Sequence, residues 1–192
     1  MAITKIHAIT GTIGKSIDYI CNPDTTDDEC LLSFNACSHK TVEYDFKFAL
    51  DRTMHHDRNL AYHLIQSFKP GEISSEEAHK IGEELAKEVL GSKYSYVIAT
   101  HNDKGHIHNH IIFCAADNID HKKYHDCRET YYNIRNISDK ICNSHGLYVI
   151  PENSNRTKKS HSRTEWQAKK DGNSWKSKLK KDIDECLKFC GS

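Results

Sequence analysis

The residues of this 192-residue chain that could do chemistry gather around one short turn. His101, His106, His108 and His110 fall within ten positions, and the turn-forming run Asn102-Asp103-Lys104-Gly105 interrupts them. If both flanks of this turn are strands, they form a hairpin. Because side chains alternate between the faces of a strand, positions 106, 108 and 110 share one face. Three neutral imidazoles bind a divalent ion and leave coordination positions open, which is typical of a catalytic metal site.

The alternative for these histidines is an ordinary place on the surface or in the core of an edge hairpin. Four imidazoles at this spacing would make a poorly packing face, so we favour a metal site. Imidazole as a ligand favours zinc, copper, nickel or iron over magnesium. Which of His106, His108 and His110 is not a ligand stays open, because either neighbouring pair fits strand geometry.

The net charge of zero hides an asymmetry along the chain. Residues 153–192 carry 11 Lys or Arg against 5 Asp or Glu, and the preceding part carries 16 against 22. A basic end on an acidic body is compatible with nucleic-acid binding, and equally with a solvated linker and helix face. The eight cysteines form no CxxC pair and so indicate no cysteine zinc site. Without a long apolar run or a secretory leader, we predict a cytoplasmic protein with no membrane insertion.

Hydrophobic periodicity and turn residues predict the elements that must position the histidines. We predict strands over 2–9, 31–34, 59–68, 94–99 and 106–116, and helices over 41–51, 75–90 and 128–144. A further helix starts at Ile13 and is ended by Pro23. This order predicts an α+β fold with a mainly antiparallel central sheet backed by helices and the metal site on the open sheet face. Residues 1–150 form the expected catalytic domain. Residues 151–192 form a basic linker and helical extension, whose unpacked apolar stripe indicates a piece of a longer protein.

A metal site of this kind does not by itself identify a nucleophile. Tyr19 lies in the last turn of the helix that starts at Ile13, off the isoleucine stripe, where it could be exposed towards a cleft. Other tyrosines have structural interpretations, because they lie on expected strands or on the core stripe of the 128–144 helix. These are Tyr62, Tyr94, Tyr96 and Tyr131, with Tyr132 beside them.

Three ordered motifs resemble one family. The pattern His101-x-Asp103-x-x-His106-x-His108-x-His110 is similar to the third motif of conjugative relaxases of the MOBP type, which belong to the HUH endonuclease superfamily. Residues 17–23 resemble the first motif, with its nucleophilic tyrosine, and residues 62–72 resemble the second motif region. Residues 138–147 and 165–176 are similar to relaxases of mobile elements in Gram-positive bacteria. The literal His-hydrophobic-His triplet is 106–108, whereas the matched pair, His108 and His110, encloses Asn109.

The resemblance implies a role for each matched residue. His101, His108 and His110 would hold Mn²⁺ or Mg²⁺, with Zn²⁺ the choice that the three imidazoles alone suggest. Asp103 or His106 would orient an imidazole by hydrogen bonding. His63, on the expected strand over 59–68, is a further candidate for this role, with a satisfied core histidine as the alternative. Tyr19 would attack one phosphodiester at a transfer origin, giving a 5′-phosphotyrosyl enzyme and a free 3′-hydroxyl, and so initiate conjugative transfer or mobilisation. The catalytic base is open between Asp18 and Asp103, since a phenol is mostly protonated at neutral pH.

The implied substrate is single-stranded origin DNA with an adjacent hairpin, helped by an accessory DNA-binding protein and a coupling protein. Phosphate contacts and base stacking would come from the basic end of the chain. The candidates are Lys158, Lys159, Arg163, Trp166, Lys169, Lys170 and Trp175. Two rival functions are a zinc-dependent hydrolase of a small molecule, which needs no basic extension, and a non-catalytic DNA-binding module, which needs no histidines.

Overall fold

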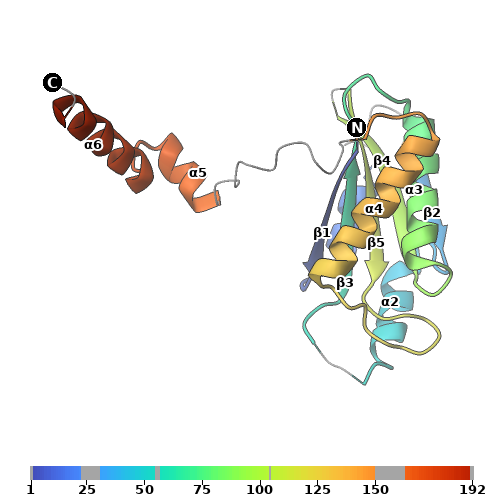
Figure 1. Cartoon of the computed structure of the whole chain (residues 1–192). Helices are drawn as coiled ribbons and strands as arrows, with labels where there is room; N and C mark the ends of the chain where they lie inside the picture. Colours follow the sequence, from blue (N-terminus) through green and yellow to red (C-terminus); the bar gives the residue numbers. More distant parts are fainter. Residues whose placement is uncertain (1, 23–30, 55–56, 104, 150–162, 191–192) are drawn as a thin grey trace. The chain divides into compact units, whose positions relative to one another are not determined.

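The computed structural model describes residues 2–22, 31–54, 57–103, 105–149 and 163–190 (Figure 1). The chain divides into two compact units, Met1–Ile150 and Pro151–Ser192. In the described part of the chain, no helix combines the length and the apolar character that crossing a membrane requires.

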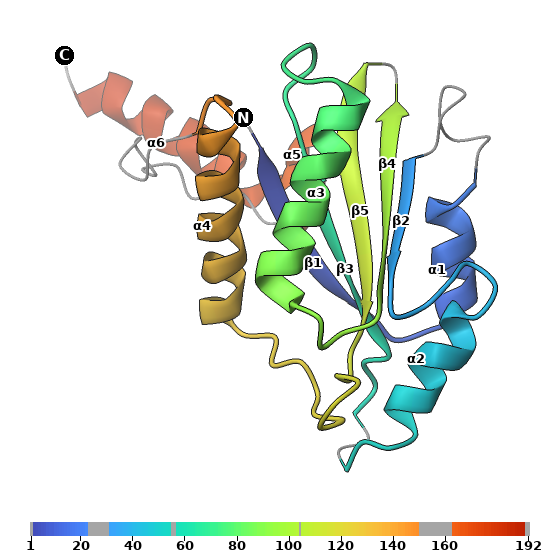
Figure 2. The same cartoon turned by 90° about the vertical axis from the view of Figure 1, so that its right-hand side faces the viewer.

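One five-stranded sheet organises the first unit. Its strands are β1 (Ile3–Ile9), β2 (Leu31–Asn35), β3 (Ala61–Ser67), β4 (Tyr96–Asp103) and β5 (His106–Cys114). They stand in the order β1-β3-β5-β4-β2, and every neighbouring pair is antiparallel (Figure 2). The strands that carry the histidines, β4 and β5, therefore lie in the interior of the sheet, where both edges of each backbone are hydrogen-bonded. The predicted antiparallel sheet backed by helices is confirmed.

Helices cover both faces of this sheet, and alternation along the strands divides the core in two. The helices of the first unit are α1 (Ile13–Ile20), α2 (Val42–Leu50), α3 (Ser75–Leu90) and α4 (Arg128–Ser144). On one face, α3 and α4 pack on Leu64, Ile98 and Ile111. On the other face, α1 and α2 pack on Val97 and Ile112. Because His108 and His110 alternate with Asn109 and Ile111, they lie on the face of α1 and α2.

The ends of α3 follow the sequence signals. Ser74 Oγ accepts a hydrogen bond from the Glu77 backbone N–H at 3.2 Å, and Glu77 Oε2 accepts one from the Ser74 N–H at 3.4 Å, which completes the predicted capping box. Gly91 ends the helix with φ of 60°, a conformation that residues with a Cβ rarely adopt.

Two local expectations were wrong. β4 continues to Asp103, so residues assigned to the turn belong to the strand, because they pair with the start of β5. Tyr131 was expected on the buried stripe of α4, but it is exposed. The buried residues of α4 include Ser138 instead, whose hydroxyl accepts a hydrogen bond from Gln66 Nε2 at 2.8 Å.

The second unit contains two helices, α5 (Arg163–Lys170) and α6 (Trp175–Cys190). Gly172, between them, has φ of 72°. On α6, Trp175, Leu179 and Ile183 follow each other at intervals of four residues and are exposed, so they form an apolar stripe along one side of the helix.

Candidate metal centre and nucleophile

The register of the β4–β5 hairpin brings three imidazoles together. His101 pairs directly with His108, and His110 follows two residues later on the same face of β5. Their ring centroids are 5.5 Å apart for His101 and His108, 4.5 Å for His101 and His110, and 4.7 Å for His108 and His110. Each ring offers one nitrogen within 4.8 Å of the other two. The three residues predicted as metal ligands therefore converge on one point.

Hydrogen bonds orient each of these rings. His101 Nε2 lies 2.8 Å from the Ile20 carbonyl oxygen, and His108 Nδ1 lies 3.1 Å from the His106 carbonyl oxygen. A carbonyl oxygen can only accept, so these nitrogens carry the protons, and His101 Nδ1 and His108 Nε2 keep their lone pairs. Metal-binding histidines commonly use their second nitrogen in this way.

His110 is held by another imidazole. Its Nδ1 lies 2.8 Å from Nε2 of His63, which is buried on the neighbouring strand β3. Its Nε2 is buried and has no hydrogen-bond partner among the residues that the structure describes. A buried polar atom without a partner is costly. With Nδ1 donating to His63, the Nε2 lone pair is available to a cation, so the residues fit a metal ion.

Burial favours the neutral form of His63, His108 and His110. Burial, reinforced by the positive forms of the neighbouring imidazoles, lowers the pKa of His63 to about 4 and that of His110 to about 2. Burial also lowers the pKa of His108, against the opposite effects of the His106 carbonyl and the Asp103 carboxylate. The neutral form is the one that binds metals, so these shifts favour the binding form of His108 and His110.

Two further predicted residues lie beside His108. The Asp103 carboxylate is exposed, and its Oδ2 is 3.6 Å from His108 Nε2, which places a negative charge next to the converging nitrogens. The His106 ring is 6.0 Å from the His108 ring and does not belong to the three-histidine cluster, whereas its backbone carbonyl oxygen accepts the hydrogen bond from His108 Nδ1.

Sequence reasoning missed His7. It lies on β1 directly opposite His63, and the two rings are 4.8 Å apart. The line of imidazoles therefore runs from the exposed His7 through His63 to His110. The presence of a histidine on the first predicted strand was the available signal, but the pairing of β1 with β3 was needed to interpret it.

Tyr19 lies beside the cluster. Its ring centroid is 6.2 Å from that of His110 and 6.4 Å from that of His101, and its side chain is 58% exposed. Ile13, Ile17 and Ile20 bury the opposite side of α1 against the sheet, which turns Tyr19 outward. The hydrogen bond from His101 to the Ile20 carbonyl then ties the end of α1, next to Tyr19, to a candidate ligand.

The competing tyrosines lie on the other side of the sheet. Tyr62, Tyr94 and Tyr96 belong to the core beneath α3 and α4. Tyr131 and Tyr132 project from α4, which packs on that same face. The sheet therefore separates these five phenols from the three histidines.

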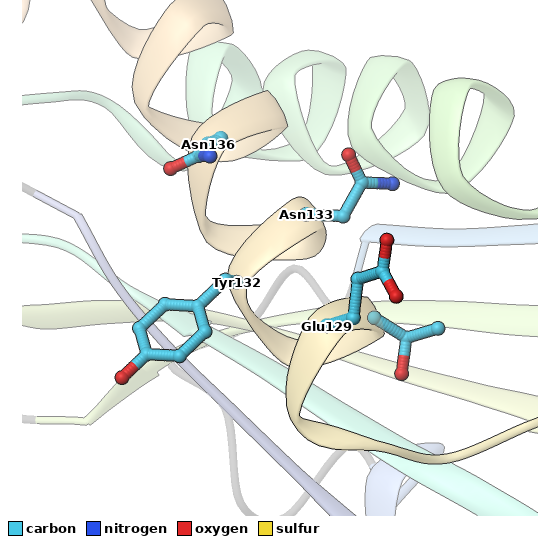
Figure 3. Close-up of a pocket in the computed structure, with 5 residues that line it drawn as sticks. Glu129, Tyr132, Asn133 and Asn136 are labelled. Atoms are coloured by element: carbon cyan, nitrogen blue, oxygen red, sulfur yellow. The ribbon is translucent and has the colours of Figure 1, made fainter.

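A hollow on the outer side of α4 is lined by polar side chains. Figure 3 shows Glu129, Tyr132, Asn133 and Asn136 around it, all from this one helix. Because α4 covers the sheet face opposite the histidines, this hollow is not part of the candidate metal centre.

The predicted DNA-binding residues all belong to the second unit. Lys158 and Lys159 fall outside the described residues, whereas Arg163, Trp166, Lys169 and Lys170 lie on α5. Trp175 begins α6 with its ring 63% exposed, and the Lys176 ammonium lies 5.6 Å from the ring centroid. An exposed indole beside cations suits stacking on a base, so these residues stay candidates.

Comparisons with known proteins agree on one class of enzyme. A relaxase family model, described as the MobA/VirD2-like nuclease domain, matches residues 19–147. Protein rlx of Staphylococcus aureus is 31% identical over 96% of this chain and 53% of its own length. The group II intron-interrupted relaxase LtrB of Lactococcus lactis is 28% identical over 89% of this chain and 36% of its own length. The chain therefore spans about half, or less, of these curated relatives.

Solved structures share the fold. The MobM relaxase domain bound to 26-nucleotide pMV158 oriT DNA superimposes with a TM-score of 0.61 at 13% identity, covering 86% of this chain and 98% of that one. A Mn-bound crystal structure of the MobM domain with a 22-nucleotide oriT DNA gives a TM-score of 0.59 at 11% identity, with coverages of 86% and 97%.

Proposed function

Because this chain belongs to the family of relaxases with a MobA/VirD2-like nuclease domain, we propose that it nicks and rejoins one DNA strand at a transfer origin. The reaction is a transesterification that initiates conjugative transfer or mobilisation. The observation that carries this proposal is the exposed phenol of Tyr19 beside three converging imidazoles from a separate part of the chain. A small-molecule hydrolase does not require that phenol as a nucleophile, and a DNA-binding module without catalytic activity does not require the three imidazoles.

Tyr19 is the proposed nucleophile. Its hydroxyl oxygen attacks the scissile phosphorus, the bond from phosphorus to the 3′-oxygen breaks, and the strand ends as a 5′-phosphotyrosyl link and a free 3′-hydroxyl. The link keeps the energy of the phosphodiester, so the reverse attack by a 3′-hydroxyl rejoins the strand without ATP. Asp18 and Asp103 remain the candidates for accepting the phenolic proton, and both are exposed.

His101, His108 and His110 would hold a divalent metal ion, for which Mn²⁺ is the first choice because the structurally similar MobM domain is Mn-bound. When bound, such an ion polarises a phosphoryl oxygen and neutralises developing charge. The chain itself supplies the orientation: the Ile20 carbonyl and His63 hold two of the rings, and the sheet fixes their backbones. Three protein ligands leave positions open for a phosphate oxygen.

The proposed substrate is single-stranded origin DNA, since the structurally similar MobM domain is bound to oriT DNA. Residues of the basic extension, including Arg163, Lys169, Lys170 and Trp175, would contact phosphates and stack on bases. An adjacent DNA hairpin, an accessory DNA-binding protein and a coupling protein complete the proposed partners. The reaction would take place in the bacterial cytoplasm, where the plasmid or chromosomal origin lies.

The test is formation of a covalent adduct. The chain is incubated with a labelled single-stranded oligonucleotide containing its origin and with Mn²⁺, and the products are separated on a denaturing gel. We expect a labelled protein band for the wild type and for Tyr131→Phe, a matched control because Tyr131 is exposed on the other side of the sheet. We expect none for Tyr19→Phe. An adduct that persists in Tyr19→Phe contradicts the assigned nucleophile.

Two outcomes would favour the rival functions. Binding of the oligonucleotide without any adduct under all metal conditions would favour a DNA-binding module. Metal-dependent hydrolysis of a small phosphoester that is unchanged in Tyr19→Phe, with no DNA adduct, would favour a hydrolase.

A further inference from the structure

A buried chain of polar side chains lies directly behind the candidate ligands, on the sheet face that α3 and α4 cover. Its two central members alternate with the histidines along the strands: Thr100 precedes His101, and Asn109 separates His108 from His110. Thr100 is 2% exposed and Asn109 is fully buried. Apolar residues are the norm at such packed positions, since burying a polar group costs free energy unless it is hydrogen-bonded.

The Asn109 side-chain amide forms hydrogen bonds with three different elements. Its Oδ1 accepts from Thr100 Oγ1 at 2.7 Å, and its Nδ2 donates to Gln66 Oε1 at 3.1 Å and to the Ala78 carbonyl at 2.6 Å. Gly82 of α3 leaves room for it, because a Cβ at that position would come within 2.6 Å of Asn109 Nδ2. One side chain of β5 is thereby bonded to β4, β3 and α3.

The network continues in both directions. The Asn109 Oδ1 atom can only accept, so Thr100 donates its one hydroxyl hydrogen there, and the bond of 2.7 Å between Thr100 Oγ1 and His79 Nδ1 is donated by His79. His79 Nε2 reaches Ser33 Oγ of β2 at 2.8 Å. At the other end, Gln66 Nε2 donates to the Ser138 hydroxyl of α4 at 2.8 Å.

We infer that Thr100 and Asn109 are positioning residues that hold the metal-binding histidines in register. They are directly opposite each other on β4 and β5, next to the pair formed by His101 and His108. Their side-chain bond forms in one register only. A slip of one residue would turn the histidines of one strand to the other face of the sheet. The polar residue in the His108-Asn109-His110 triplet thus has a physical role. This inference rests on the proposed metal site.

The test uses two substitutions of Thr100 that separate its hydroxyl from its methyl group. Thr100→Val keeps the shape of the side chain and removes its hydroxyl. Thr100→Ser keeps the hydroxyl and removes the methyl group. Mn²⁺ binding to the metal-free chain is measured by titration calorimetry at a temperature where every variant is folded. We expect Val to weaken binding about tenfold or more, as losses of orienting hydrogen bonds around metal sites typically do, and Ser to retain affinity within about twofold.

A control separates positioning from stability. Ser138→Ala removes the hydrogen bond between Gln66 and Ser138 at the far end of the same network. Because this bond involves neither β4 nor β5, we expect a lower melting temperature and unchanged Mn²⁺ affinity. Equal affinity of the Val variant and the wild type would overturn the inference, as would a larger loss in the Ser variant than in the Val variant.

Amide hydrogen exchange of the metal-free chain supplies a second readout that needs no metal. We expect faster exchange of the β4–β5 amides near His101 and His108 in Thr100→Val, and not in Thr100→Ser or Ser138→Ala. Exchange rates unchanged in the Val variant would contradict the inference. If the wild type binds no Mn²⁺ but the exchange difference is present, the proposed metal site fails while the control of register stands.

Discussion

Replacement of His63 tests how the protein prepares His110 to bind a metal. His63 Nε2 is the partner of His110 Nδ1 at 2.8 Å, and its ring lies between those of His7 and His110 at centroid distances of 4.8 and 4.9 Å. His63→Phe keeps an aromatic ring at this position and removes the acceptor. His63→Gln removes the ring but offers an amide oxygen that can accept.

The expected magnitude follows from the burial of the pair. Both rings are nearly inaccessible, at 8% and 5% exposure, so water cannot replace the missing acceptor. In His63→Phe the His110 Nδ1–H is left buried and unsatisfied, which costs about 1–3 kcal/mol of unfolding free energy in the metal-free protein. Because the proton is no longer held on Nδ1, the tautomer with a free Nε2 is less favoured. We expect the Mn²⁺ dissociation constant to rise by about 10- to 100-fold, or roughly 1.4–2.7 kcal/mol.

Calorimetric titration with Mn²⁺ and urea unfolding of the metal-free chain measure the two effects separately. His63→Gln should recover part of the affinity lost in the Phe variant, since its amide oxygen can accept the same proton. Wild-type affinity in His63→Phe would refute the reasoning, because it would mean that the orientation of His110 does not depend on this hydrogen bond.

Three further outcomes follow from the structure. Mn²⁺ at about 100 times its dissociation constant should stabilise the chain by roughly 2.7 kcal/mol in thermal unfolding, and His110→Ala should abolish this gain; a gain of equal size in the variant would contradict the ligand assignment. Gly82→Ala should destabilise the chain by about 1–3 kcal/mol in urea, because its Cβ would lie 2.6 Å from Asn109 Nδ2; a neutral effect would show that α3 can move away from β5. Asp117→Asn should lower the free energy of unfolding by about 1 kcal/mol at pH 7, because four backbone N–H groups donate to the carboxylate. Burial raises the pKa of Asp117, but these four hydrogen bonds lower it by more, so the net shift is downward. A carboxyl with a lowered pKa stabilises the fold above its ordinary pKa and loses this contribution as the pH falls through the folded value. The difference from wild type should therefore shrink as the pH falls below the ordinary pKa of an aspartate; a constant difference would exclude ionisation as its cause.

The correct expectations concern features whose cause is local. The spacing of His106, His108 and His110 requires one face of a strand, whatever the rest of the chain does. The Ser74 and Glu77 pair predicts the start of α3, because the capping bonds span three residues. The outward direction of Tyr19 follows from the isoleucine stripe of a single helix.

The expectations that were wrong or missing depend on packing. The predicted turn ended β4 too early, since strand pairing with β5 extends it to Asp103. Periodicity alone predicts a buried Tyr131, but this side chain is exposed. The polar Ser138 is buried between α4 and the sheet instead, because its hydroxyl accepts a hydrogen bond from Gln66. His7 had no assigned neighbour until β1 was seen to pair with β3.

The sequence by itself therefore determined which residues are the candidates for the proposed chemistry: a row of imidazoles on a hairpin and an exposed phenol on an early helix. Tertiary structure alone decided that they meet. The strand order β1-β3-β5-β4-β2 and the register that sets His101 opposite His108 arise from contacts between distant segments, and the end of α1 reaches His101 only through the packed sheet. Periodicity reports the face on which a side chain lies, but which faces come together is decided by the burial of apolar surface over the whole domain.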